Sequence, residues 1–88
     1  MIRRELTPTD NRKSFYGKCY VEKYENGDET LFSYETPIMT KTNNGEYHRH
    51  YDDWTATTGR HIKAFCGMNK YEFTEMPIWK YYKKEEQK

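Results

Sequence analysis

The chain has 88 residues, enough for one small domain but not for a second core. Aromatic residues make up 17% of it and nine of them are Tyr, which excludes a disordered chain, because disordered chains are poor in aromatic residues. Fifteen basic and fourteen acidic side chains are mixed along the sequence and leave a net charge of +1. That balance excludes a strong overall field toward a nucleic-acid backbone or an anionic membrane.

The N-terminal residues are predicted to form an arm over positions 1–14, followed by a single α+β domain over 15–80 and a charged tail over 81–88. No apolar run approaches the length of a membrane span, and nothing near the N-terminus resembles a signal peptide. The two cysteines, Cys19 and Cys66, lack CxxC spacing. We therefore expect reduced thiols and a cytoplasmic protein without a membrane segment.

Two Asn-Gly pairs, at residues 26–27 and 44–45, are the strongest turn signals in the chain. Asn-Gly accepts positive φ at little cost, and each pair lies between runs rich in aromatic and β-branched residues. These signals predict three antiparallel strands, over residues 15–25, about 29–41 and 46–51. Pro37 interrupts the second strand, which either bends there or lies at an edge of the sheet.

The register across the first turn stays open at this stage. A two-residue type I′ turn pairs Val21 with Phe32, whereas a type I turn followed by a Gly bulge pairs Val21 with Leu31. A slip of one residue exchanges the two faces of the strand, so the choice decides which side chains point to the core.

A helical period of apolar residues follows the strands and predicts an amphipathic helix over residues 55–66. Thr55 or Thr57 is the candidate N-cap, and Gly67 is the candidate C-terminal stop. The apolar positions that define the period are Ile62, Phe65 and Cys66.

A cap-x-x-Glu pattern that begins at Asn69 predicts a short second helix over residues 70–76, which Pro77 ends. The predicted fold class is therefore α+β: a three-stranded antiparallel β-meander with one amphipathic helix across a face and a short C-terminal helix. The helix is expected to cover one face of the sheet and to leave the other face exposed and rich in Tyr. Cys19 and Val21 point to one side of the first strand and Tyr16, Tyr20 and Tyr24 to the other, and which sheet face is exposed stays open at this stage.

The exposed sheet face is the first candidate site. Its predicted members are five tyrosines and one cation: Tyr16, Tyr20, Tyr24, Tyr34, Tyr47 and Arg49. Aromatic side chains with nearby cations can stack the bases of a single strand. Tyr and Arg also contribute much of the energy of protein interfaces. The competing interpretation is that Tyr replaces the scarce aliphatic residues in a half-hydrated core.

The start of the predicted helix is the second candidate site. Free amides at a helix N-terminus attract anions, and the side chains of Thr57, Thr58, Arg60 and His61 would add donors there. The competing interpretation is N-capping by Thr, with His61 on the flank of the apolar stripe.

No pattern in the chain indicates catalysis or a metal site. His48 and His50 project to one side of a strand, but zinc ligands usually come in tighter pairs. Cys19 and Cys66 lie at positions predicted to be buried, without the activation that a nucleophile needs. We expect no catalytic residues, no metal and no cofactor.

Four segments carry a family resemblance: FYGK at 15–18, VEKYENGD at 21–28, LFSYETPI at 31–38 and, most specifically, WTATTGRHIKAF at 54–65. They resemble a recurring type of small protein from phages and mobile elements of gut bacteria, a domain of unknown function with no assigned catalytic residues. The resemblance implies a bacterial host cell. It also implies a host protein as partner, because small accessory proteins of mobile elements often inhibit or regulate host machinery, including defence systems.

The first functional hypothesis is therefore a non-enzymatic phage or mobile-element accessory protein that binds and inhibits or modulates a host protein. One alternative is a nucleic-acid-binding regulator that uses the three-stranded sheet, although the near-neutral charge weighs against it. Another is a protein that sequesters a small anion or nucleotide at the helix N-terminus. A homodimer formed through a free sheet edge or an uncovered face also stays open.

Overall fold

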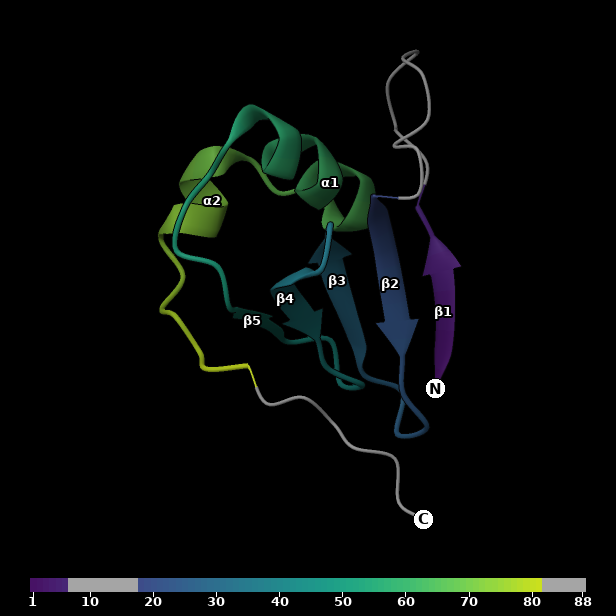
Figure 1. Cartoon of the computed structure of the whole chain (residues 1–88). Helices are drawn as coiled ribbons and strands as arrows, with labels where there is room; N and C mark the ends of the chain where they lie inside the picture. The colour runs from purple at the N-terminus through teal and green to yellow at the C-terminus, as the bar shows by residue number, and fades with distance from the viewer. Residues whose placement is uncertain (7–17, 82–88) are drawn as a thin grey trace.

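A computed structural model describes residues 1–6 and 18–81 of the chain. In this part of the chain, five strands form one antiparallel sheet in sequence order, and two helices follow them (Figure 1). The strands are β1 (Ile2–Glu5), β2 (Cys19–Lys23), β3 (Glu29–Ser33), β4 (Thr36–Lys41) and β5 (Tyr47–Arg49), and the helices are α1 (Ala56–Cys66) and α2 (Lys70–Thr74). The predicted α+β class is confirmed, but the sheet has five strands and not three.

The first additional strand is β1, in the region predicted to be an irregular arm. It pairs with β2 at one edge of the sheet, with Arg4 opposite Val21. All its residues are exposed and three of the four are charged, so it lacks the alternation of buried and exposed residues by which a strand is recognised. The remainder of the predicted arm, from residue 7 on, lies outside the described residues.

The second additional strand arises because the predicted strand over residues 29–41 folds back on itself. Ser33 pairs with Thr36, so β3 and β4 form a hairpin whose turn is Tyr34-Glu35. Beyond this turn the register shifts: Phe32 pairs with Pro37, whereas Leu31 pairs with Met39. Pro37 therefore lies at an irregularity of the ladder, where its missing N–H is tolerated.

The Asn-Gly turns form as predicted, and the first resolves the open register. Val21 pairs with Leu31, and Gly27 has φ 96°, which agrees with the Gly-bulge alternative. Gly45 takes φ 90° in the second turn. The two turns also touch, since the backbone N–H of Asn43 donates to Oδ1 of Asp28 at 2.9 Å.

Both predicted helices are present, with their predicted caps. Thr55 is the N-cap of α1, where its Oγ1 accepts from the Thr58 amide at 3.0 Å, and Gly67 ends the helix with φ 80°. Asn69 and Glu72 form the capping box of α2. This second helix ends at Thr74, shorter than the predicted 70–76. No helix in the described ranges is long and apolar enough to cross a membrane.

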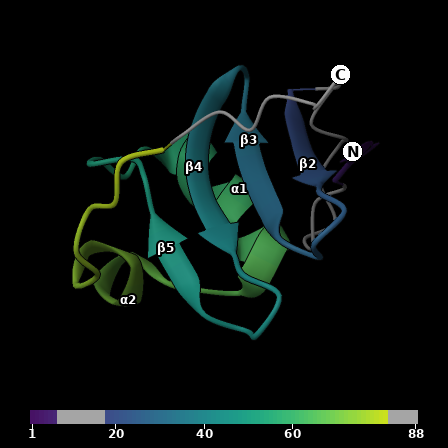
Figure 2. The ribbon, with the colours of Figure 1, turned by 90° about the horizontal axis from the view of Figure 1, so that it is seen from below.

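The core lies between the sheet and α1, which crosses one face of the strands (Figures 1 and 2). Ile62 of α1 is fully buried and Phe73 of α2 closes the core at the β5 end. The buried cluster consists of Cys19, Val21, Leu31, Ile38, Met39, Ile62 and Phe73. The helix therefore covers the face with Cys19 and Val21, which resolves the face that the sequence left open.

The opposite face of the sheet is not the exposed surface that the sequence predicts. Thr30 and Phe32, which point to that face from β3, are buried. The C-terminal segment returns to the sheet: Ile78 forms a parallel bridge with Arg49, and the Trp79 amide donates to the Arg49 carbonyl at 2.6 Å. This segment covers apolar area that a plain meander with one helix would leave in water.

Candidate functional site

The sheet face opposite α1 carries most of the ring–ring contacts among the described residues. Alternation along β2 and β3 places Tyr20 there opposite Phe32, and the C-terminal segment adds further rings. We call this surface the aromatic face and define it by seven residues: Tyr20, Tyr24, Phe32, His48, His50, Trp79 and Tyr81.

Four rings of the aromatic face contact one another in series. Tyr20 stacks on Phe32 with a centroid distance of 5.1 Å, and Tyr81 meets Phe32 edge-on at 5.8 Å. Tyr81 also meets the ring of His50 at 5.3 Å. At the outer end the guanidinium of Arg3 lies 4.3 Å from the centre of the Tyr20 ring. Such pairs add packing energy beyond the area that they bury.

Trp79 is the most prominent side chain of this face. Its indole stacks on the ring of His48, with a centroid distance of 4.0 Å and an interplanar angle of 4°. The backbone N–H and C=O of Trp79 are both hydrogen-bonded, one to the last residue of β5 and the other to the residue after it. The amide donates to Arg49, and the carbonyl accepts from Nδ1 of His50 at 2.7 Å. The side chain nevertheless stays 51% exposed. The structure therefore holds a large ring in a fixed orientation at the surface.

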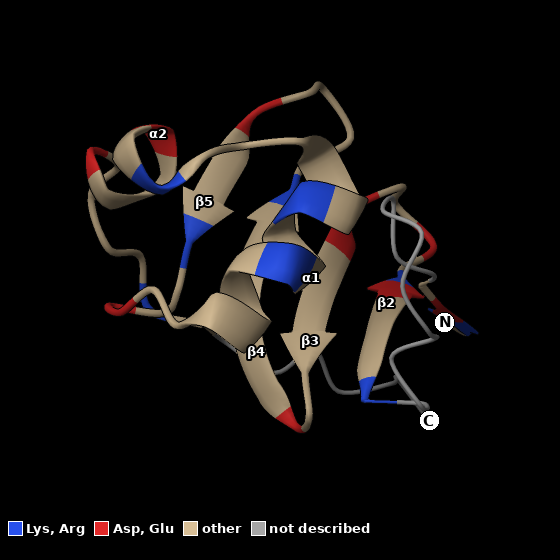
Figure 3. Cartoon of the chain, turned by 90° about the horizontal axis from the view of Figure 1, so that it is seen from above, with Lys and Arg blue, Asp and Glu red and all other residues tan. Residues whose placement is uncertain are grey.

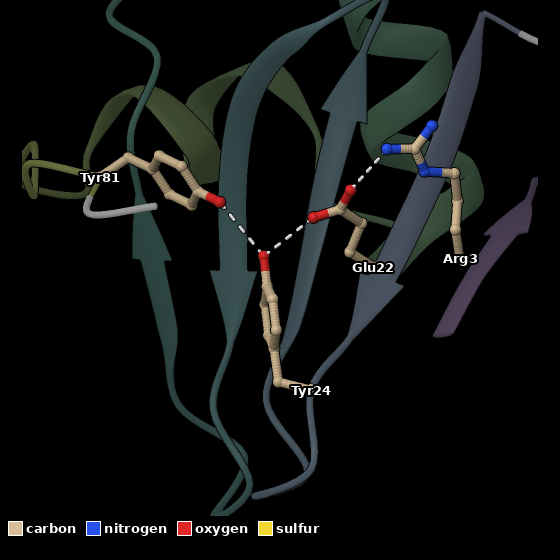
Figure 4. Close-up of polar contacts among 4 residues, drawn as sticks. All are labelled: Arg3, Glu22, Tyr24 and Tyr81. Atoms are coloured by element: carbon tan, nitrogen blue, oxygen red, sulfur yellow. Dashed lines mark hydrogen bonds and ion pairs between the residues drawn. The ribbon is translucent and has the colours of Figure 1, made fainter. Parts of the chain in front are cut away.

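A chain of polar contacts connects β1 to the C-terminal segment across the aromatic face (Figure 4). Arg3 forms an ion pair with Glu22 at 2.8 Å, and the hydroxyl of Tyr24 donates to the other oxygen of Glu22 at 3.1 Å. The hydroxyl of Tyr81 forms a hydrogen bond with the hydroxyl of Tyr24 at 3.1 Å. Burial, together with the hydrogen bond to Tyr81, raises the pKa of Tyr24, so its hydroxyl stays a neutral donor.

A second polar chain fixes His50. Its Nδ1 faces the Trp79 carbonyl, which only accepts, so Nδ1 carries the proton in this contact. Nε2 of the neutral ring then accepts from the hydroxyl of Thr40 at 2.7 Å, and Thr40 contacts Thr30 at 2.8 Å. Burial lowers the pKa of His50, which favours this neutral form.

The charges of the aromatic face are of both signs. Arg3 is opposed by the carboxylate of Glu22, and Glu5 lies on the same side because it pairs with Tyr20. Figure 3, which views the ribbon from the side of α1, shows both Lys or Arg and Asp or Glu positions along the described strands and helices. The aromatic face therefore offers contact area with little net field.

The structure brings together only part of the predicted aromatic surface. Tyr20 and Tyr24 lie on the aromatic face, whereas Tyr34 forms the β3–β4 turn and Tyr47 packs against the core on the other side of the sheet. Tyr16 lies outside the described residues.

Arg49, the cation of that predicted surface, is buried under α2. Its guanidinium donates to the backbone carbonyls of Tyr51 at 2.7 Å and of Thr74 and Met76 at 3.1 Å each. The same group lies 4.8 Å from the centre of the Phe73 ring. Arg49 thus connects the end of α2 to the sheet and is not part of an exposed surface.

The four residues of the predicted anion site are also separated. Thr57 and Thr58 border an open hollow at the N-terminus of α1, whereas Arg60 and His61 are not among the residues that line it. His61 is 2% exposed, and its Nδ1 lies 2.8 Å from Oγ of Ser33. That contact joins α1 to β3 within the protein.

The cysteines and histidines of the described chain make contacts within the protein. Cys19 is fully buried, and burial raises the pKa of its thiol to about 12. Within residues 1–6 and 18–81 no group of three or more His, Cys, Asp and Glu side chains is placed to hold a metal ion. His48 and His50, the histidines considered as metal ligands, contact Trp79 instead.

Sequence reasoning missed Trp79 and Tyr81 as members of the site. Their only local signal is an aromatic-rich stretch after Pro77, which favours packing against the sheet but does not identify β5 as the strand that it contacts. The His48 and His50 alternation was visible, but it carries no information about a stacking partner 31 positions further along the chain.

The fold and this face define a small α+β protein with an aromatic sheet surface. The model of a family of unknown function, DUF8033, matches residues 4–81, and the chain belongs to this family. No curated protein and no solved structure gives a match.

Proposed function

We propose that this chain is a non-enzymatic protein that binds another protein through the aromatic face. The observation that supports this most strongly is Trp79. Its ring stacks on His48, its amide donates to the Arg49 carbonyl and its carbonyl accepts from the His50 side chain, and yet the residue is still half-exposed. A ring that is already fixed loses little conformational entropy when a partner covers it, and Trp is enriched among the residues that dominate binding energy.

The neighbours of Trp79 support the same proposal. Ile78 is 51% exposed beside it and adds aliphatic contact area. The half-buried Tyr20 and Tyr81 supply hydroxyl-bearing rings around the patch. An apolar centre with polar rings about it is the usual anatomy of a protein interface.

A protein partner is favoured over a nucleic acid by the charges of the face. Nucleic-acid affinity comes largely from cations that neutralise phosphates. Here Arg3 is already paired with Glu22, and Glu5 adds a second carboxylate on the same side of the sheet. These carboxylates would repel a phosphate backbone.

We extend the proposal to the source and action of the protein. The resemblance of residues 54–65 to small phage and mobile-element proteins suggests a bacterial host protein as partner, in the host cytoplasm, which the chain inhibits or modulates. An anti-defence or host-takeover role is the specific form of this proposal.

Affinity measurement with matched variants tests the proposal. A tagged full-length chain is used to capture its partner from a host lysate, and the purified partner is titrated with the wild type, Trp79→Ala and Tyr71→Ala. Tyr71 is 71% exposed on α2 and serves as the control. We expect Trp79→Ala to weaken binding by about thirtyfold, and Tyr71→Ala by less than about twofold. Equal affinity of the wild type and Trp79→Ala would overturn the proposal.

A further inference from the structure

The molecule has an open hollow at the end of the sheet opposite the Asn-Gly turns, away from the aromatic face. It lies between the β3–β4 hairpin, the segment before α1 and the first turn of α1, with a volume of about 370 Å³. Its lining residues are Ser33, Tyr34, Thr36, Ile38, Tyr51, Thr55, Thr57 and Thr58. This volume falls within the range of small-molecule sites.

The chemistry of the lining is uniform. Every described lining residue except Ile38 carries a hydroxyl group, and none of these residues carries a charge. Three of the hydroxyls are used internally, because those of Thr55 and Thr58 bond each other in the helix cap and that of Ser33 bonds His61. The other four hydroxyls make no hydrogen bond with the described part of the chain; they belong to Tyr34, Thr36, Tyr51 and Thr57.

Tyr34 has an unusual backbone for a residue at the rim of this hollow. Its φ of 59° is the only positive φ among the described non-Gly residues. Gly or Asn normally fills such a position, because a side chain there is strained. Strained residues of this kind gather at binding sites, and the presence of a Tyr places an aromatic ring and a hydroxyl at the hollow.

We propose that this hollow binds a small neutral polyhydroxylated ring, either a free monosaccharide or the ribose of a nucleoside. Hydroxyls of the ring would pair with the four available hydroxyls, each of which both donates and accepts. The apolar C–H face of the ring would lie against Tyr34 or Tyr51. A purely apolar ligand would leave the hydroxyls unpaired. An anion would meet no cationic side chain among the described lining residues; the ammonium of Lys18 lies 5.5 Å from the centre of the Tyr34 ring.

Titrations of the full-length chain followed by ¹⁵N–¹H NMR test this proposal with three probes: glucose, uridine and inorganic phosphate. We expect saturable shifts of the Tyr34, Thr36 and Thr57 amides with glucose, with uridine or with both, and the responding probe identifies the source of the ring. Saturation by phosphate alone would overturn the proposal in favour of an anion site. Absence of a saturable shift with any probe up to about 20 mM would also overturn it.

Tyr34→Gly separates binding from folding, because Gly accepts the positive φ while the ring and its hydroxyl are removed. We expect the affinity for the responding sugar or nucleoside to fall by at least about tenfold, and Tyr71→Ala to leave it unchanged. Retention of full affinity by Tyr34→Gly would contradict the proposal. This test needs no protein partner, so its outcome is independent of the proposed function.

Discussion

Tyr34 occupies a turn position that a side chain disfavours, and its backbone cost can be measured. Tyr34→Gly and Tyr34→Ala remove the same ring, but only Gly relieves the strain of φ 59°. We expect the Gly variant to be more stable than the Ala variant by about 1 kcal/mol in urea unfolding. An Ala variant as stable as the Gly variant would mean that the turn relaxes to negative φ.

Two histidines give the protein a defined pH dependence. Burial is the main cause that lowers the pKa of both His50 and His61 below the ordinary value of 6.5, and Arg60 lowers that of His61 further. Below pH 6.5 the unfolded chain therefore binds more protons than the folded one. Stability is complete above this pH and is lost as the pH falls through the lowered folded values.

We expect a lower urea midpoint at about pH 5 than at about pH 7.5, with a loss of at most about 1.4 kcal/mol per pH unit for each histidine. His61→Gln should reduce this slope, because one of the two groups no longer titrates. An unchanged slope in His61→Gln would show that His61 does not contribute.

Arg49 is a residue whose loss should affect stability more than binding. Its guanidinium, 7% exposed, satisfies three backbone carbonyls around the end of α2. Arg49→Met keeps much of the volume but leaves these acceptors without their charged donor, so we expect a loss of about 3 kcal/mol in the free energy of unfolding. The free energy of unfolding of Arg49→Lys should lie between those of the wild type and Arg49→Met, because an ammonium cannot reach all three carbonyls at once. A loss below about 0.5 kcal/mol in Arg49→Met would refute this role.

At the scale of elements, α1 is positioned by a contact with the segment before it. A Cβ on Gly59 would lie 2.7 Å from two carbons of the Trp54 indole, so the helix needs Gly where its backbone meets this ring. Gly to Ala within a helix normally stabilises by about 1 kcal/mol. Here we expect Gly59→Ala to destabilise by about 1–3 kcal/mol.

A double-mutant cycle isolates this contact. In a Trp54→Ala background the clash is absent, and Gly59→Ala should become neutral or stabilising by up to about 1 kcal/mol. Thermal unfolding of the four proteins measures the coupling. The same destabilisation in both backgrounds would exclude Trp54 as the cause.

The elements that could be predicted are those whose ends are encoded locally. Gly27 and Gly45 mark their turns by positive φ. The starts of the two helices are encoded by Thr55 and Asn69, whose side chains each accept from an amide only three residues further along the chain. The Tyr34 turn could not be predicted, because it contains none of the residues that normally mark a reversal.

The edge strand β1 could not be predicted for a different reason. Its side chains are all exposed, so burial leaves no pattern in its sequence, and its pairing with β2 is set by backbone hydrogen bonds. Ion pairs of Arg3 with Glu22 and of Arg4 with Glu29 support the pairing, but such contacts are visible only once the strands are adjacent.

At the scale of the whole molecule, the return of the C-terminal segment decides what the candidate site looks like. The alternation of β2 correctly predicts that Tyr20 and Tyr24 share a face, but only tertiary contacts add Trp79 and Tyr81 to it. The same long-range contacts bury Phe32, which local sequence cannot reveal. The two faces of the sheet therefore have separate roles, one for the core and one for the proposed partner.

Hydrogen exchange of the chain with and without its purified partner tests the proposed interface most directly. The account predicts slower exchange in β2, β3 and the segment of Trp79 and Tyr81 in the complex, with little change in α1. Protection confined to α1 or α2, with unchanged exchange at Trp79, would contradict it.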